Sequence, residues 1–305
     1  MSRVVLSPNA FRDIDTEGEE RFIATLCAAV NGIVEPAVGA SAIDILVREQ
    51  SLEAYTKYKE SEERDDGVRD VTNWQRYLWR LLAEAAMALT PGYLGQDVLI
   101  HLVQELMLLP KHSLLWINYY GEEHQLELWT VNYENCFGDL PSLMFSLTNS
   151  DDSLATRYVR FSSVHARLVG ACIANVLDLC PFGSFGYAIT RDKAGPGDDD
   201  RVLAASQWTF NAGMVLWEIC EKRVWNYYSY GPHIWKSWAA VFTRAAAADN
   251  RYGNEAREAA RQALHHMKDV EKQGIISNVS IVDVFGMRVI ADSDEEVDEE
   301  EENKE

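Results

Sequence analysis

Residues 74–89 read WQRYLWRLLAEAAMAL, and this stretch decides the fold class. Its apolar residues recur every three or four positions, while Arg80 and Glu84 fall on the opposite side. That spacing is typical of an amphipathic α-helix, in which one stripe of side chains packs into a core. Pro91 and Gly92 follow directly and predict the end of the helix.

The helical period extends over most of the chain. Further helices are predicted at 19–34, 40–58, 94–106, 154–177, 201–224, 234–248 and 254–272. Few polar residues occur between Val202 and Cys220, so this helix is predicted to be central and nearly enclosed. The segment 111–152 is irregular and is interpreted as loops and short helices, whereas 279–290 has a β-like pattern. We therefore predict an all-α fold, either an irregular multi-helix bundle or a helical array.

The predicted organisation is one helical domain over 16–272, a short extension over 273–291 and an acidic tail over 292–305. The tail contains ten acidic residues and one Lys. Such a block of like charge cannot bury enough apolar surface to fold, so we predict that it is disordered. It either engages a basic partner or only keeps the protein soluble, and we favour the second interpretation.

The composition excludes several classes of protein. Of the 305 residues, 47% are hydrophobic, and 48 Asp and Glu face 28 Lys and Arg, which gives a net charge of −20. A soluble globular protein fits these values, and the acidic balance argues against binding to nucleic acid or to an anionic membrane. Five widely spaced Cys without a CxxC motif, and a beginning without a secretory signal, predict an intracellular protein. We expect the cytoplasm rather than the nucleus.

Several short motifs occur together in a fixed order: WQRYLW at 74–79, VHARL at 164–168, AASQW at 204–208, WKSW at 235–238 and ALHHM at 263–267. This set resembles a fungal family of helical proteins that is named only as a domain of unknown function. The resemblance spans roughly 74–272, with departures at His165 and at 188–193. It implies an all-helical fold and no established activity, cofactor or catalytic residue.

No metal or cofactor site is predicted. The seven His form neither HxxxH nor HExxH, and the adjacent His265 and His266 point about 100° apart on a helix. Motifs for a serine nucleophile, for phosphate and for a dinucleotide are missing. Two acidic clusters, 65–70 and 198–200, are superficially similar to the Mg²⁺-binding acids of helical terpene synthases. The second cluster directly precedes a helix, so we interpret it as helix capping.

His165 is the first candidate for a functional residue. It lies on the same helical stripe as Tyr158, Phe161 and Leu168, which places an imidazole among apolar neighbours. One alternative is a general base in a pocket. The other, which we favour, is a buried histidine whose ring is satisfied by a hydrogen bond.

An arginine cluster and an aromatic cluster supply the remaining candidates. Arg157, Arg160 and Arg167 either bind an anionic ligand or pair with the surplus carboxylates. Eight Trp and Tyr residues fall within 208–238. The Trp residues in the helix are expected in the core, and the residues around the loop at 226–233 are candidates for binding. The candidate residues are His165, Arg160, Arg167, Tyr227, Tyr228, Tyr230, His233 and Trp235.

Two functional hypotheses remain open. The first is a non-catalytic scaffold or protein-interaction module that uses the aromatic loop and the face formed by Arg157–Arg167. The second is a small-molecule-binding protein or an enzyme of fungal specialised metabolism, with His165, Tyr228 and Tyr230 around an aromatic pocket. A protein or a small apolar ligand is therefore the expected partner, no catalytic motif is recognised, and the sequence does not predict the oligomeric state.

Overall fold

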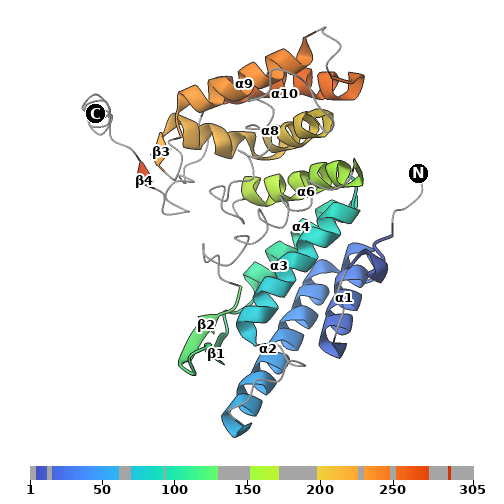
Figure 1. The fold of residues 1–305 in the computed structure, drawn as a ribbon, viewed down its shortest axis with the longest axis vertical. Helices are drawn as coiled ribbons and strands as arrows, with labels where there is room; N and C mark the ends of the chain where they lie inside the picture. Colours follow the sequence, from blue (N-terminus) through green and yellow to red (C-terminus); the bar gives the residue numbers. More distant parts are fainter. Residues whose placement is uncertain are drawn as a thin grey trace. The chain divides into compact units, whose positions relative to one another are not determined.

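The computed structural model describes residues 5–11, 16–61, 70–92, 94–129, 152–171, 198–225, 230–247, 252–274 and 288–289. It divides into two compact units, Met1–Leu168 and Val169–Glu305. Each unit is built mainly from α-helices, which confirms the predicted all-α fold (Figure 1). The single domain over 16–272 and the extension stay predictions, and the acidic tail lies outside the described residues.

The first unit contains a group of helices and one β-hairpin. Its elements are η1 (Pro8–Ala10), α1 (Glu17–Val30), α2 (Pro36–Ser61), α3 (Val71–Ala88), α4 (Leu94–Leu108), β1 (Ser113–Ile117), β2 (Glu123–Glu127) and α6 (Asp152–Gly170) up to residue 168. Helix α2 packs against α1, α3, α4 and β1. Two helix starts follow from local chemistry, because Thr16 and Glu19 form a capping box on α1 and Asp70 accepts a hydrogen bond at the start of α3.

The stretch that predicted the helical period also builds the core of this unit. Trp74 of α3 stacks on Phe22 of α1, with ring centroids 5.6 Å apart and an angle of 12° between the planes. Tyr77 meets both rings edge-on. All three side chains are buried. Aromatic pairs of this kind add stability beyond the area that they bury.

The interpretation of 111–152 as loops and short helices is wrong for residues 113–127, which form an antiparallel hairpin. In its register Ser113 lies opposite Glu127 and Ile117 lies opposite Glu123. Gly121 has a φ of +79°, which a residue with a side chain rarely adopts, and this supports the turn. Each strand has only five residues, SLLWI and EHQLE, and neither alternates apolar and polar side chains, so the sequence carries no β pattern here. Residues 130–151 lie outside the described part.

The second unit contains α8 (Asp198–Glu221), β3 (Val224–Trp225), α9 (Pro232–Ala246), α10 (Asn254–Gln273) and β4 (Arg288–Val289). Helix α10 packs against α8 and α9. Every residue from Val202 to Cys220 is buried or half-buried, which confirms the prediction of a nearly enclosed helix. Strands β3 and β4 pair antiparallel, so the described part of the β-like run is indeed a strand.

Two cysteines behave as buried apolar residues, as the sequence predicted. Cys27 and Cys220 are free and buried. Burial raises the pKa of Cys27 to about 11 and that of Cys220 to about 12, so both thiols stay protonated at neutral pH. In the part of the chain that the structure describes, no helix has the length and apolar character needed to cross a bilayer.

Candidate functional site

His165 lies deep in the fold, on the helix α6. Its side chain is buried, and its ring centroid is 5.4 Å from that of Phe161. Burial lowers the pKa of His165 to about 3. A general base works best when its pKa is near the working pH, so a histidine with this pKa is a poor base at neutral pH. The burial of His165 therefore favours a structural role over that of a general base, and the hydrogen bond expected for its ring stays a prediction.

Two of the three arginines of α6, Arg160 and Arg167, form contacts within the first unit. Arg160 donates from Nη1 to the carbonyl oxygens of Met87 and Ala88, each at 3.4 Å. These carbonyls belong to the last turn of α3, which lacks helical partners of its own. Arg167 pairs with Asp97 in the first turn of α4. Their contacts are those of arginines that hold helix ends together, and a role of either residue in binding stays a prediction.

A buried amide connects the same helices. Gln96 donates from Nε2 to the carbonyl oxygens of Leu89, at 3.0 Å, and Arg160, at 3.3 Å. Its Oε1 accepts a hydrogen bond of 3.0 Å from the Ser163 hydroxyl. Gln96 and Ser163 are both buried. Because a buried polar group is costly unless it is hydrogen-bonded, this network serves the stability of the core.

The predicted aromatic loop lies only partly in the described residues. Tyr227 and Tyr228 fall outside them. Tyr230 is buried, whereas His233 is exposed on the first turn of α9. Trp235 is buried, and its Nε1 donates to a carboxylate oxygen of Glu271 at 2.8 Å.

Further aromatic rings surround Trp235 in the second unit. Its ring centroid is 5.3 Å from that of Trp217 and 6.1 Å from that of Trp238. Trp208 is also fully buried, as expected of a core residue. His165 belongs to the first unit and Tyr230 to the second, and each unit is described by itself. A pocket formed by both residues therefore stays a prediction.

The acidic clusters act at helix starts where the structure describes them. Asp70 accepts a hydrogen bond of 2.9 Å from the Asn73 amide at the start of α3. Both oxygens of Asp199 accept the N–H of Gly253 at 3.0 Å, and Gly253 is the N-cap of α10. Asp199 thus contacts the start of a neighbouring helix. Among the described residues, no group of three or more His, Cys, Asp or Glu is placed to hold a metal ion.

The tip of the hairpin is a candidate site that the sequence interpretation missed. Tyr119 and Tyr120 are 85% and 83% exposed, and their rings meet edge-on with centroids 5.6 Å apart. Large aromatic side chains are usually at least partly buried, so two adjacent exposed rings stand out. The available signal was Asn118 and Gly121, two typical turn residues that enclose the tyrosines.

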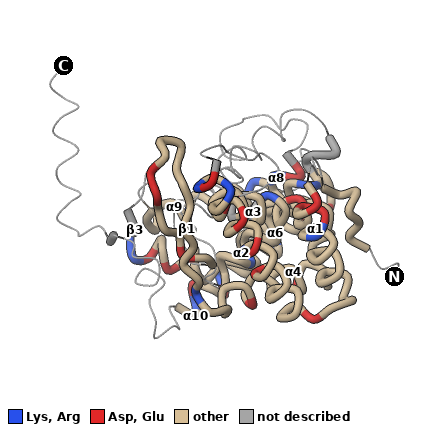
Figure 2. The backbone as a smooth tube through the Cα atoms, turned by 90° about the horizontal axis from the view of Figure 1, so that it is seen from below, with Lys and Arg blue, Asp and Glu red and all other residues tan. Residues whose placement is uncertain are grey.

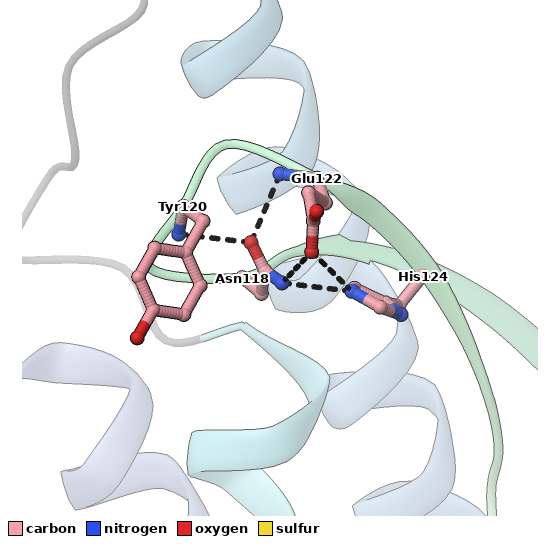
Figure 3. Close-up of polar contacts among 4 residues, drawn as sticks. All are labelled: Asn118, Tyr120, Glu122 and His124. Carbon is pink, nitrogen blue, oxygen red and sulfur yellow. Dashed lines mark hydrogen bonds and ion pairs between the residues drawn. The ribbon is translucent and has the colours of Figure 1, made fainter.

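One side chain organises the backbone that carries these rings. The Oδ1 of Asn118 accepts the N–H groups of Tyr120 and Glu122, each at 2.9 Å (Figure 3). Its Nδ2 donates to the Glu122 carboxylate at 2.7 Å and lies 2.8 Å from Nε2 of His124. Since Nδ2 is a donor, Nε2 of His124 is the acceptor in this contact. These contacts hold the backbone of the turn.

The hairpin is also attached to α2 just below its tip. The Tyr55 hydroxyl donates to Oε2 of Glu123 at 2.5 Å, and Lys59 pairs with the same oxygen at 2.9 Å. Both contacts lower the pKa of Glu123, and the hydrogen bond from Tyr55 has the larger effect. At the other end of the hairpin, Lys111 donates to the carbonyl oxygen of Trp129 at 2.6 Å. The hairpin is thus fixed at both ends.

The charge on the hairpin has one sign. Residues 113–127 contain Glu122, Glu123 and Glu127 but no Lys or Arg. Figure 2 shows acidic stretches, in red, on the tube beside the label β1. Glu122 is the acidic residue beside the tyrosines, because Glu123 pairs with Lys59 and Glu127 lies opposite Ser113 at the other end of the hairpin. The carboxylate of Glu122 attracts basic groups.

The comparisons with known proteins give a family and no activity. No curated protein matches the chain, and no solved structure matches it either. One family model matches residues 79–244, more than half of the 305 residues. This match lies within the range over which the sequence resembled a domain of unknown function, and it confirms that resemblance. The chain belongs to the family described as protein of unknown function (DUF3632).

Proposed function

We propose that this chain is a non-catalytic protein-interaction module, and that the tip of its hairpin binds the basic surface of a partner protein. The observation that carries the proposal is the exposure of Tyr119 and Tyr120 on a turn whose backbone is held by Asn118. Tyrosine is one of the residues that most often dominate the binding energy of protein interfaces.

The rigidity of the turn supports this role. Binding is weakened by the entropy lost when loops and side chains become ordered at an interface. The contacts of Asn118 and the attachment of Glu123 to Tyr55 and Lys59 fix the turn in the free protein. Less ordering is then left for the moment of binding, so more of the contact energy stabilises the complex.

The charge beside the tyrosines supports a basic partner. Glu122 lies two residues after Tyr120, and the whole chain has a net charge of −20. An arginine of a partner can stack on a tyrosine ring, and such cation–π contacts contribute about 0.5–1 kcal/mol at exposed sites. Complementary charge also speeds the encounter and selects against acidic surfaces.

The described residues give less support to the alternative of an enzyme or small-molecule-binding protein. Its candidate base, His165, has a pKa of about 3 because it is buried. Arg160 and Arg167, which were expected on the binding face of the interaction module, contact helix ends within the first unit, so the proposal rests on the hairpin tip instead. We also infer an intracellular, cytoplasmic setting, which the free thiols of Cys27 and Cys220 support.

Site-specific photo-crosslinking tests the proposal. With the photoreactive amino acid benzoylphenylalanine in place of Tyr120, we expect the full chain in its own cells to crosslink to a surface of one protein that is rich in Lys and Arg. The double variant Tyr119→Ser/Tyr120→Ser should lose that same protein from the complex. The control Leu108→Ser removes an equally exposed apolar side chain at the end of α4 and should keep it.

Two results would contradict the proposal. One is a double variant that retains the crosslinked protein as well as the wild type does. The other is native mass spectrometry that shows a bound small molecule on protein purified from its own cells, with no polypeptide partner at any stage of purification.

A further inference from the structure

Helix α9 exposes a side that carries basic residues and no acidic ones. Residues 222–248, which include α9, contain four Lys and Arg and no Asp or Glu, whereas the whole chain has a net charge of −20. The exposed residues of α9 recur every three or four positions and therefore share one side of the helix. They are His233, Lys236, Ser237, Ala240, Thr243 and Arg244. An acidic segment can therefore approach α9 without meeting a carboxylate of that helix.

The end of α10 adds a lysine to this side. Nε1 of Trp235 donates to Glu271 at 2.8 Å, so the start of α9 lies beside the end of α10. Lys268 precedes Glu271 by three residues and therefore lies on the same side of α10. Lys236 and Lys268 are both exposed, and neither forms an ion pair with another described residue. We call His233, Lys236 and Lys268 the basic face.

The two carboxylates at the end of α10 have partners of their own. Asp269 lies 3.7 Å from Nζ of Lys272, and Glu271 accepts the hydrogen bond from Trp235. The positive charge of the basic face is therefore left for a segment of the chain, or of another chain, that the described residues do not include.

The acidic tail begins close to the basic face. Strand β4 pairs with β3, which begins three residues after the end of α8 (Figure 1). Cys220, in the last turn of α8, is hydrogen-bonded to the backbone of Gly231 and Trp235 at the start of α9. The pairing of β4 therefore holds the chain near the start of α9. Asp292, the first acidic residue of the tail, follows Val289 by only three residues.

We propose that the basic face binds the acidic tail of the same chain, residues 292–305. The tail has ten acidic residues and one Lys, so its charge is opposite to that of the basic face. From Val289 to residue 305 the chain can span about 50 Å when extended, because each residue adds about 3.3 Å. Helix α9 is about 22 Å long, at about 1.5 Å per residue. The tail is therefore long enough to run along the whole helix.

The tether favours the chain's own tail over an acidic segment of another protein. Exposed ion pairs are individually weak and are screened by salt, so a separate acidic peptide binds such a surface weakly. A segment attached beside its binding site acts at an effective concentration in the millimolar range. The bound tail neutralises the basic face and competes with acidic segments of other proteins. This face belongs to the second unit, so the inference does not depend on the proposed function of the hairpin tip.

Carbodiimide crosslinking of the full chain tests where the tail binds. This reagent joins a carboxylate to an amine only when the two are in contact, and a mixture of chains with natural and heavy nitrogen separates links within a chain from links between chains. At low salt we expect links within one chain from the tail to Lys236 or Lys268, and at least a tenfold decrease in 0.5 M salt. Links that form only between chains, links spread evenly over all exposed lysines, or no links to the tail would each overturn the proposal.

Competition with a peptide tests whether the tail occupies the face. In a full-length variant, the eight acidic residues of 294–302 are replaced by Asn or Gln. A fluorescent peptide with the sequence of 290–305 should bind this neutral-tail variant at least tenfold more tightly than the wild type, whose own tail competes. Fluorescence anisotropy at low salt is the measurement.

Charge reversal shows which residues bind the peptide. In the neutral-tail variant, Lys236→Glu/Lys268→Glu should weaken peptide binding at least tenfold. Arg21→Glu/Lys57→Glu makes the same change of charge on α1 and α2 and should leave the affinity within twofold. Circular dichroism of all variants checks the fold. Equal peptide binding by the wild type and the neutral-tail variant, or an equal loss in the two charge reversals, overturns the proposal.

Discussion

Two amide side chains of the first unit each form a network of hydrogen bonds, one in the core and one at the surface. Gln96 is fully buried and bonds to the carbonyl oxygen of Leu89 and the hydroxyl of Ser163. Asn118 lies in a surface turn and bonds to the backbone of Tyr120 and Glu122. The first network joins three helices of a core, and the second presents two exposed rings. A polar network by itself therefore does not indicate function, which depends on what the network positions.

The largest effect is expected at the buried amide. Gln96→Leu removes the partners of Ser163, Leu89 and Arg160 while these groups stay buried. Each buried polar group left unsatisfied costs about 1–3 kcal/mol, so we expect the free energy of unfolding to fall by about 3 kcal/mol. Urea denaturation of the full chain measures this change.

An exposed amide supplies the control for that measurement. Gln125 lies on β2 with its side chain exposed. Gln125→Leu should change the free energy of unfolding by less than about 0.5 kcal/mol, as is usual for surface substitutions. Equal effects of the two substitutions would show that the buried network contributes no more than a surface residue, and the contrast between the two amides would fail.

The buried side of the comparison also predicts a dependence on pH. His165 has a pKa of about 3 in the folded protein and about 6.5 when unfolded. Between these values the unfolded chain binds a proton that the folded chain does not. Stability therefore falls as the pH is lowered from about 6.5 towards 3, by about 1 kcal/mol per pH unit from this residue.

Substitution isolates the contribution of the imidazole. His165→Leu should make the stability less dependent on pH over that range, whatever its effect at pH 7. Phe161→Leu alters the neighbouring ring and should lower stability without a change in the pH slope. Thermal denaturation between pH 4 and pH 7 is the measurement, and identical slopes for the wild type and His165→Leu would contradict the assignment.

A smaller and local effect is expected at the surface amide. Asn118→Ala removes the acceptor for two backbone N–H groups and should lower stability by about 1 kcal/mol or less, because water can replace it in the exposed turn. Hydrogen exchange of the peptide 113–127 should become faster, most of all at Tyr120 and Glu122. Asn118→Asp keeps the acceptor oxygen and should preserve part of the protection. Unchanged exchange in Asn118→Ala would show that the turn does not depend on this side chain.

The helices could be predicted from the sequence because each repeats a local pattern over many residues. The stripe that begins at Trp74 both forms α3 and reaches the core, and the apolar neighbours of His165 correctly predicted its burial. The contacts of Arg160 could not be predicted, since Met87 and Ala88 lie more than seventy residues away along the chain. Contacts over such a distance depend on the packing of whole helices.

The exposed features were harder to predict for a different reason. The hairpin consists of two strands of five residues, and a pattern of that length is compatible with a loop. The exposure of Tyr119 follows from where the turn ends up in the folded unit, which one sequence does not state. The exposure of Val38, Ile45 and Leu52 on α2 could not be predicted either, because apolar residues at helical spacing predict burial unless the neighbours of the helix are known.

The smallest effect on stability is expected at the two tyrosines of the proposed binding site. Tyr119→Ser/Tyr120→Ser should change the free energy of unfolding by less than about 0.5 kcal/mol, since both rings are exposed. Tyr77→Ala is the matched change in the core and should cost about 3 kcal/mol, because that ring is buried against Phe22 and Trp74. Equilibrium unfolding of both variants gives the comparison. A large loss in the double variant would mean that the tyrosines support the fold, and their exposure would then no longer indicate a binding site. If the double variant is as stable as the wild type but no longer binds its partner, the two tyrosines act in binding and not in folding.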